Sequence, residues 1–189
     1  RTEDFLGLAV LGRALRKLSQ HARVLLHTDD VPQHLLDVLA EDFELRRVED
    51  VAADPSRTYR LASPEMRRLF LKLRAFEQED FDKVLFLDAD LLVRRSLDKL
   101  FELPAPAGVE VNAAPDAAPV TPSGLLIDAA RLVNPGSGRL VSRINGGVLL
   151  LAPSRSVFEA LLAEALSPGP DSSCCPEEDL LTRIFLGRW

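Results

Sequence analysis

The stretch "FDKVLFLDADLLVRRSLDKLF", residues 81–101, is the part of the sequence that decides the fold prediction. Its apolar run at 84–87 predicts a buried strand, and Asp88 and Asp90 follow where that strand ends. Aspartate is depleted in strands and is costly to bury without a partner. Side chains at positions i and i+2 of an extended segment point the same way, so we expect a positive group between the two carboxylates.

The composition limits the classes of protein that are possible. With 189 residues, of which 47% are hydrophobic, the chain is long enough for one domain with a real core. The net charge of −6 and the absence of a basic stripe argue against nucleic acid as a partner. No apolar run approaches the ~18 residues of a membrane span, so we expect no membrane segment in this chain.

Short apolar strands alternate with amphipathic helices along the sequence. We expect helices over 5–18, 32–43, 63–81, 96–103, 154–166 and 176–185, and strands over 24–27, 43–51, 84–87, 109–114, 124–127 and 144–154. This order predicts the α/β class, with a single open, mainly parallel sheet flanked by helices. The proline-rich residues 104–143 read as a loop-rich insertion within one domain that spans residues 1–189.

The two aspartates suit a metal ion at the edge of such a sheet. Ligands of open α/β sheets bind at the carboxyl ends of the strands. Oxygen ligands favour Mg²⁺ or Mn²⁺, and these ions keep open positions that substrate phosphates can fill. A dication attracts each carboxylate more strongly than the carboxylates repel each other. The alternative is that the pair caps a turn or binds Arg94 and Arg95.

Three other segments carry polar residues of interest. The Asn-Gly-Gly run at 145–147 leads into a buried strand, and its glycines allow close approach to a ligand or form a simple tight turn. Asp116 follows a predicted strand and alone would be a turn residue. Glu177 and Glu178 begin a helix, where acids interact favourably with the helix dipole.

Taken in order, four segments resemble the glycogenin-like glycosyltransferases of family 8. They are "LKLRAFEQEDFDKVLFLDADLLVRRSLDKLF", "AAPD", "INGGVLLLAPSRSVFEALL" and "PEEDLL". The resemblance implies a GT-A fold and retaining transfer of a hexose from a UDP-sugar to an acceptor hydroxyl, with Mn²⁺ or Mg²⁺ as the cofactor. The acceptor would be a glycan, a protein or a small molecule.

The resemblance also implies roles for individual residues. Asp88 and Asp90 would hold the metal as a D-x-D motif. The residues that bind the substrate would be Lys72, Ala89, Asn145, Gly146 and Gly147, and the catalytic residues would be Asp116, Glu177 and Glu178. The family also implies a first strand ahead of residue 4 and a late histidine ligand, so we expect the domain to be incomplete at both ends.

Two other readings compete with the transferase. A catalytically degenerate GT-A domain could act as a scaffold or as a subunit of a larger assembly. Phosphatases of the haloacid dehalogenase type also have an apolar strand that ends in D-x-D, but their strand lies near the start of the chain. We expect a cytoplasmic location, with the Golgi lumen as the alternative.

Overall fold

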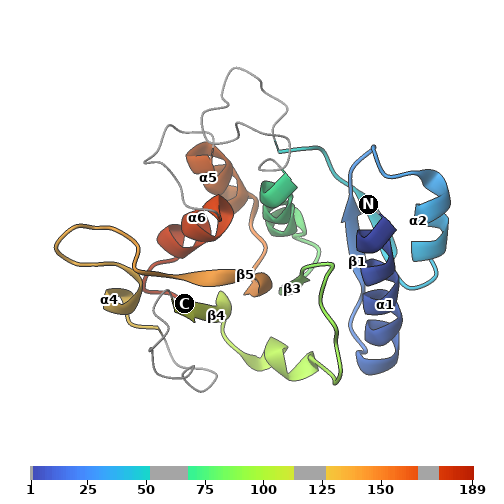
Figure 1. Cartoon of the computed structure of the whole chain (residues 1–189), viewed down its shortest axis with the longest axis horizontal. Coiled ribbons are helices and arrows are strands. Elements are labelled where there is room, and N and C mark those ends of the chain that lie inside the picture. The colour runs from blue at the N-terminus through green and yellow to red at the C-terminus, as the bar shows by residue number, and fades with distance from the viewer. Residues whose placement is uncertain (1, 52–67, 113–126, 166–174) are drawn as a thin grey trace.

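A computed structural model describes residues 2–51, 68–112, 127–165 and 175–189 of the chain (Figure 1). The helices are α1 (Thr2–Leu18), α2 (Gln33–Leu39), α4 (Ala129–Leu132), α5 (Arg155–Ala165) and α6 (Pro176–Ile184), with 3₁₀ helices η2 (Phe70–Glu77) and η3 (Asp98–Glu102). The strands are β1 (Val24–His27), β2 (Glu44–Arg47), β3 (Val84–Leu87), β4 (Ala107–Asn112) and β5 (Ser142–Leu151). The mixed α/β class predicted from the sequence is confirmed.

One helix differs in type from its prediction. The start of the helix expected over 63–81 lies outside the described residues, and residues 70–77 form a 3₁₀ helix. A 3₁₀ helix repeats every three residues, so Phe70, Leu73 and Phe76 lie on one line along it. All three side chains are buried in the core, which explains the tighter winding.

The described strands form two sheets. β1 pairs in parallel with β2, and helix α2 connects them. β5 is the central strand of an antiparallel sheet in the order β3-β5-β4. The prediction of a single, mainly parallel sheet is therefore wrong for the described residues. The hydrophobic periodicity of the sequence could not predict whether β5 runs parallel or antiparallel to its neighbours. The apolar run at 148–151 suits a buried strand in either kind of sheet.

β1 and β3 each keep one edge without a strand partner in the described part of the chain. Residues of both strands line a cavity of about 1010 Å³, together with side chains of α1 and η2. Every residue of β1 and β3 is only half-buried. The edges of β1 and β3 that lack a strand partner among the described residues thus belong to strands that line one cavity.

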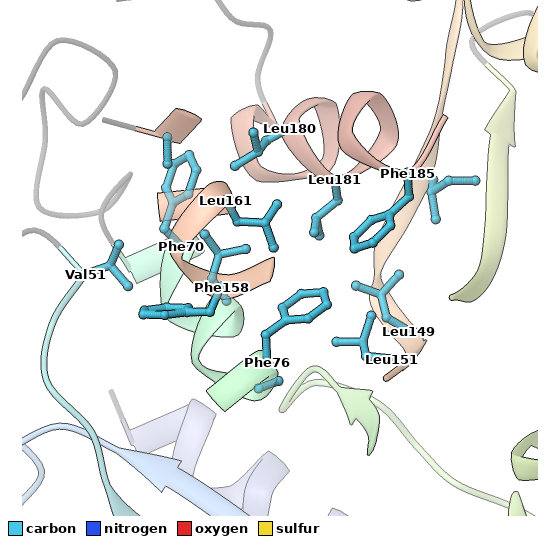
Figure 2. Packing of buried hydrophobic residues seen from close by; sticks show 14 of the residues in the cluster. Val51, Phe70, Phe76, Leu149, Leu151, Phe158, Leu161, Leu180, Leu181 and Phe185 are labelled. Atoms are coloured by element: carbon cyan, nitrogen blue, oxygen red, sulfur yellow. The ribbon is translucent and has the colours of Figure 1, made fainter. Parts of the chain in front are cut away.

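The hydrophobic core lies between η2, α5, α6 and β5 (Figure 2). Phe76 stacks on Phe185 with ring centroids 5.8 Å apart, and Trp189 meets Phe185 edge-on at 5.5 Å. Burying each such leucine or aromatic side chain contributes roughly 1.5–3 kcal/mol. The core holds α6 against β5, which places the first turn of α6 at the side of the sheet near the end of β3.

Two glycines allow α1 to pack closely against other segments. A methyl group on Gly12 would lie 2.4 Å from the Phe43 ring, and one on Gly7 would lie 2.7 Å from the carbonyl oxygen of Ala89. The start of α1 therefore lies beside the chain that leaves β3. Neither α1 nor any other helix in the described parts has the length and apolar content that a membrane crossing requires.

Candidate functional site

Asp88 and Asp90 lie at the carboxyl end of β3, where the sequence places them. The Asp88 N–H still donates to the carbonyl oxygen of Gly147 at 2.9 Å, but the chain then turns at Ala89 and Asp90. Residues 89–90 are therefore not extended as expected, although both carboxylates still face one cavity. The Asp88 side chain is 40% exposed and Asp90 is exposed, and both line the cavity described above.

The arginines that follow the turn do not neutralise these acids. Among the described residues no ion pair joins Asp88 or Asp90 to Arg94 or Arg95, and both arginines are exposed. The ion pair of Asp88 is with Lys72, whose ammonium lies 3.8 Å from Oδ1. The structural alternative for the aspartate pair is thus not supported.

Lys72 projects from η2 into the middle of the site, with its side chain only 9% exposed. Its ammonium donates to the carbonyl oxygen of Gly146 and to Oε1 of Glu177, each at 3.3 Å. It also lies 5.6 Å from the centre of the Phe86 ring. The cation is therefore held by groups from β5, α6 and β3 at once.

Glu178 is also anchored to Gly146. Its Oε1 accepts the N–H of Gly146 at 2.8 Å, and its Oε2 forms an ion pair with Nε of Arg143 at 2.8 Å. Thr182, one turn further along α6, accepts the N–H of Ile144 at 2.9 Å. Side chains of α6 thus bond directly to the backbone of β5.

The glycines at 146 and 147 are required by their neighbours. A methyl group on Gly146 would lie 2.8 Å from Nζ of Lys72, and one on Gly147 would lie 3.3 Å from Oδ2 of Asp88. The side chain of Asn145 accepts the N–H of Gly147 at 3.0 Å. The sequence predicted that a ligand could approach these glycines closely. In the structure, the side chains of Lys72 and Asp88 approach them.

The site carries more negative than positive charge. Burial raises the pKa of Asp88; the charge of Lys72 opposes this, whereas the charges of Asp90 and Glu178 raise the pKa further. The ionisable side chains that interact around Asp88 and Lys72 are the carboxylates Asp88, Asp90, Glu177 and Glu178 and the cations Lys72 and Arg143. Arg23, Arg68 and Lys83 line other parts of the same cavity. Within this cluster the formal charges leave two negative charges uncompensated, a local excess that a divalent cation could offset.

The structure brings together nearly all of the predicted site residues. One cavity is lined by Lys72, Asp88, Ala89, Asp90, Asn145, Gly147, Glu177 and Glu178. Gly146 contacts Lys72 and Glu178 at its rim. Asp116 lies outside the described residues.

The carboxylates of Asp88 and Asp90 form the donor set at the end of β3. No cluster of three His, Cys, Asp or Glu side chains suited to a metal occurs within the described ranges. Mg²⁺ is commonly bound by one or two carboxylates, with substrate phosphates and water completing its shell. Two carboxylates with two uncompensated charges around them fit that manner of binding.

Sequence reasoning missed Arg143 and Thr182. Thr182 lies four residues after Glu178, a spacing that places both on one face of a helix. Arg143 lies two residues before Asn145 in a strand, so the two side chains share one face. These spacings mark both residues as neighbours of predicted site residues, although only the packing of α6 on β5 shows what they contact.

Comparisons with known proteins agree with this geometry. A family model described as glycosyl transferase family 8 matches residues 5–121. An uncharacterized protein of Acanthamoeba polyphaga mimivirus is 26% identical over 97% of this chain and 63% of its own length. Glycogenin of Neurospora crassa is 24% identical over 84% of this chain and 20% of its own length.

A further relative is the putative UDP-glucuronate:xylan alpha-glucuronosyltransferase 5 of Arabidopsis thaliana, 26% identical over 86% of this chain and 24% of its own length. The chain thus spans less than two thirds of these relatives. Among solved structures, the bifunctional glycosyltransferase WbbM in its apo form superposes with a TM-score of 0.58 at 18% identity, covering 98% of this chain and 36% of WbbM. This likeness is consistent with the predicted GT-A type of fold.

Proposed function

Because the chain belongs to glycosyl transferase family 8, we propose that it is a retaining transferase domain that moves a hexose from a UDP-sugar to an acceptor hydroxyl. The family implies a sugar donor and an acceptor. The uridine diphosphate and the metal are supported by one observation: two carboxylates at the end of β3 lie in a site with two uncompensated negative charges. The family assignment replaces the phosphatase reading.

In this proposal Asp88 and Asp90 hold Mn²⁺ or Mg²⁺ together with the diphosphate of the donor. When bound, the cation supplies positive charge that offsets the charge developing on the leaving diphosphate. Lys72, whose ammonium lies 3.8 Å from Asp88, would add a second positive charge and is held in place by Glu177 and the carbonyl oxygen of Gly146. Such fixed charges stabilise a transition state because they need no reorganisation during the reaction.

The remaining side chains shape the donor pocket. Ala89 and the segment 145–147 line the cavity close to Asp88 and would face the nucleotide and the sugar. Asp116 and Glu177 would orient donor hydroxyls, as carboxylates do when they accept hydrogen bonds. The acceptor, a glycan, a protein or a small molecule, would enter at the open part of the same cavity.

Calorimetric titration with UDP in the presence of Mn²⁺ tests the proposal. We expect binding that needs the metal and is lost in Asp90→Ala, since this exposed turn residue can change without disturbing the core. Asp82→Ala removes an exposed aspartate at the opposite end of β3 and is the matched control, with binding unchanged. Undiminished UDP binding in Asp90→Ala would reject the metal site. A folded chain that binds neither UDP nor Mn²⁺ would favour the scaffold reading.

A further inference from the structure

The pairing of β4 with β5 is interrupted at the Asn-Gly-Gly segment. Gly108 pairs with Leu149, but the next pair joins Glu110 to Ile144, so residues 145–148 have no β4 partner in the described register. Buried N–H groups need acceptors, and a stretch that leaves the ladder must find them elsewhere.

Helix α6 supplies these acceptors from its side chains. Thr182 Oγ1 accepts the N–H of Ile144 at 2.9 Å, and Glu178 Oε1 accepts the N–H of Gly146 at 2.8 Å. The two acceptors lie one helical turn apart, and the two donors lie two residues apart on one edge of β5. At Gly146, α6 therefore takes the place of the missing strand partner, and at Ile144 it bonds to the strand at the edge of the interruption.

The second oxygen of Glu178 is also occupied. Oε2 lies 2.8 Å from Nε of Arg143, and the residue is only 8% exposed. Each oxygen of this carboxylate thus faces a protein group, and burial leaves little of its surface open to a sugar hydroxyl or an anomeric carbon. The same Gly146 that Glu178 holds by its N–H presents its carbonyl oxygen to the ammonium of Lys72 at 3.3 Å.

We propose that Glu178 is a positioning residue of the donor site and does not contact the sugar. It fixes the backbone of 145–147, and through Gly146 it fixes the ammonium of Lys72. Arg143 is its counter-charge and allows a fourth carboxylate to lie close to Asp88. This inference rests on the proposed function only for the identity of the donor, because the anchoring of Gly146 is a property of the fold.

The test compares Glu178→Gln with the double variant Glu178→Gln/Arg143→Met. A glutamine side chain has only one oxygen, which can accept either from the N–H of Gly146 or from Arg143. Its NH₂ group then faces the remaining donor and cannot accept a hydrogen bond from it. Methionine at position 143 removes the guanidinium donor and keeps an aliphatic side chain, so the glutamine oxygen can bind Gly146 alone. By NMR we expect Glu178→Gln to speed amide exchange at Gly146 by roughly tenfold, the loss expected for one weakened buried hydrogen bond. In Glu178→Gln the dissociation constant for UDP with Mn²⁺ and the KM for a UDP-sugar should rise, with little change in kcat. The double variant should restore the exchange rate at Gly146, the dissociation constant and the KM.

Thr182→Val is the matched control for general loosening of α6. It should speed exchange at Ile144 and leave Gly146 protected. A double variant with normal protection at Gly146 and normal KM but a kcat that stays low would overturn the proposal, because the carboxylate would then act on the sugar. An amide of Gly146 that exchanges equally slowly in Glu178→Gln and the native chain would overturn it too. If the native chain binds no UDP, the proposed function fails, whereas the exchange at Gly146 still decides whether Glu178 is the anchor.

Discussion

The ammonium of Lys72 lies 3.3 Å from a carboxylate oxygen of Glu177, and the two residues are 105 positions apart in the sequence. Both side chains are less than a tenth exposed. The other oxygen of Glu177 is buried and has no hydrogen-bond partner in the described structure. The pair joins η2 to α6 next to Asp88, so the stability of the fold and the charge of the site depend on the same contact.

Replacing Lys72 by methionine should lower the free energy of unfolding by about 3–5 kcal/mol, because Glu177 is left as a buried charge without its cation. Urea unfolding followed by circular dichroism measures this. The double variant Lys72→Met/Glu177→Gln removes both charges and should recover much of the loss. Lys99→Met, at an exposed position of η3, should change stability by no more than about 0.5 kcal/mol. A Lys72→Met variant as stable as the native chain would show that the pair contributes nothing.

Gly146→Ala should weaken UDP binding more than it weakens the fold. The added methyl would lie 2.8 Å from Nζ of Lys72, so the ammonium must leave its place beside Glu177. Such overpacking costs about 1–3 kcal/mol in a well-packed site. Calorimetry with UDP and Mn²⁺, together with a thermal melt, separates the two effects. Gly136→Ala, where the nearest atom is 3.4 Å away on Asn134, should change neither measurement.

The sequence predicted the order of elements because amphipathic helices and apolar strands carry their own periodicity. It did not predict the antiparallel sheet, since β5 is apolar on both faces over residues 148–151 and such a run fits either direction. It also missed α4 within the loop-rich insertion. This short helix is held by the side chain of Asp128, which accepts the N–H of Ala130, a capping signal within a proline-rich region.

Most of the site was predicted from the strand end and from the family resemblance. The roles within it were less predictable, because they depend on contacts between distant segments. Glu178 illustrates this: its position at a helix start suggested a dipole interaction or catalysis, whereas the packing of α6 on β5 commits it to Gly146 and Arg143. No local pattern specifies that two elements 30 or more residues apart will exchange such bonds.

The free edges of β1 and β3 can be identified residue by residue. On β1, the carbonyl oxygens of Arg23 and His27 accept hydrogen bonds from β2. Because backbone groups of a strand alternate between its two edges, those of Val24 and Leu26 face the cavity. On β3, the N–H of Asp88 donates to β5, which by the same alternation turns the groups of residues 85 and 87 toward the cavity.

Hydrogen exchange should therefore divide each of these strands into two sets. We expect the cavity-facing amides to exchange at least roughly tenfold faster than those bonded to a neighbouring strand, because opening them breaks no ladder bond. The fast set is Val24, Leu26, Leu85 and Leu87, and the internal controls are Leu25 and Phe86. NMR of the 189-residue chain resolves them. Equal protection in both sets would mean that the two sheets close on each other or that another segment covers the edges.

Asp88→Asn should stabilise the fold near pH 7 while it abolishes metal-dependent UDP binding. The pKa of Asp88 is raised in the folded state, chiefly by burial, so the ionised side chain costs folding free energy above that pKa. Asparagine has no such cost, and the loss of the 3.8 Å contact with Lys72 offsets only part of the gain. The stability difference should shrink as the pH falls through the raised pKa, and should vanish below the ordinary value near 3.8, where the carboxyl is neutral in both states. Urea unfolding at a series of pH values measures it, with Asp82→Asn, a change at an exposed aspartate, as the control. A variant less stable than the native chain at pH 7 would show that Lys72 outweighs burial at this strand end.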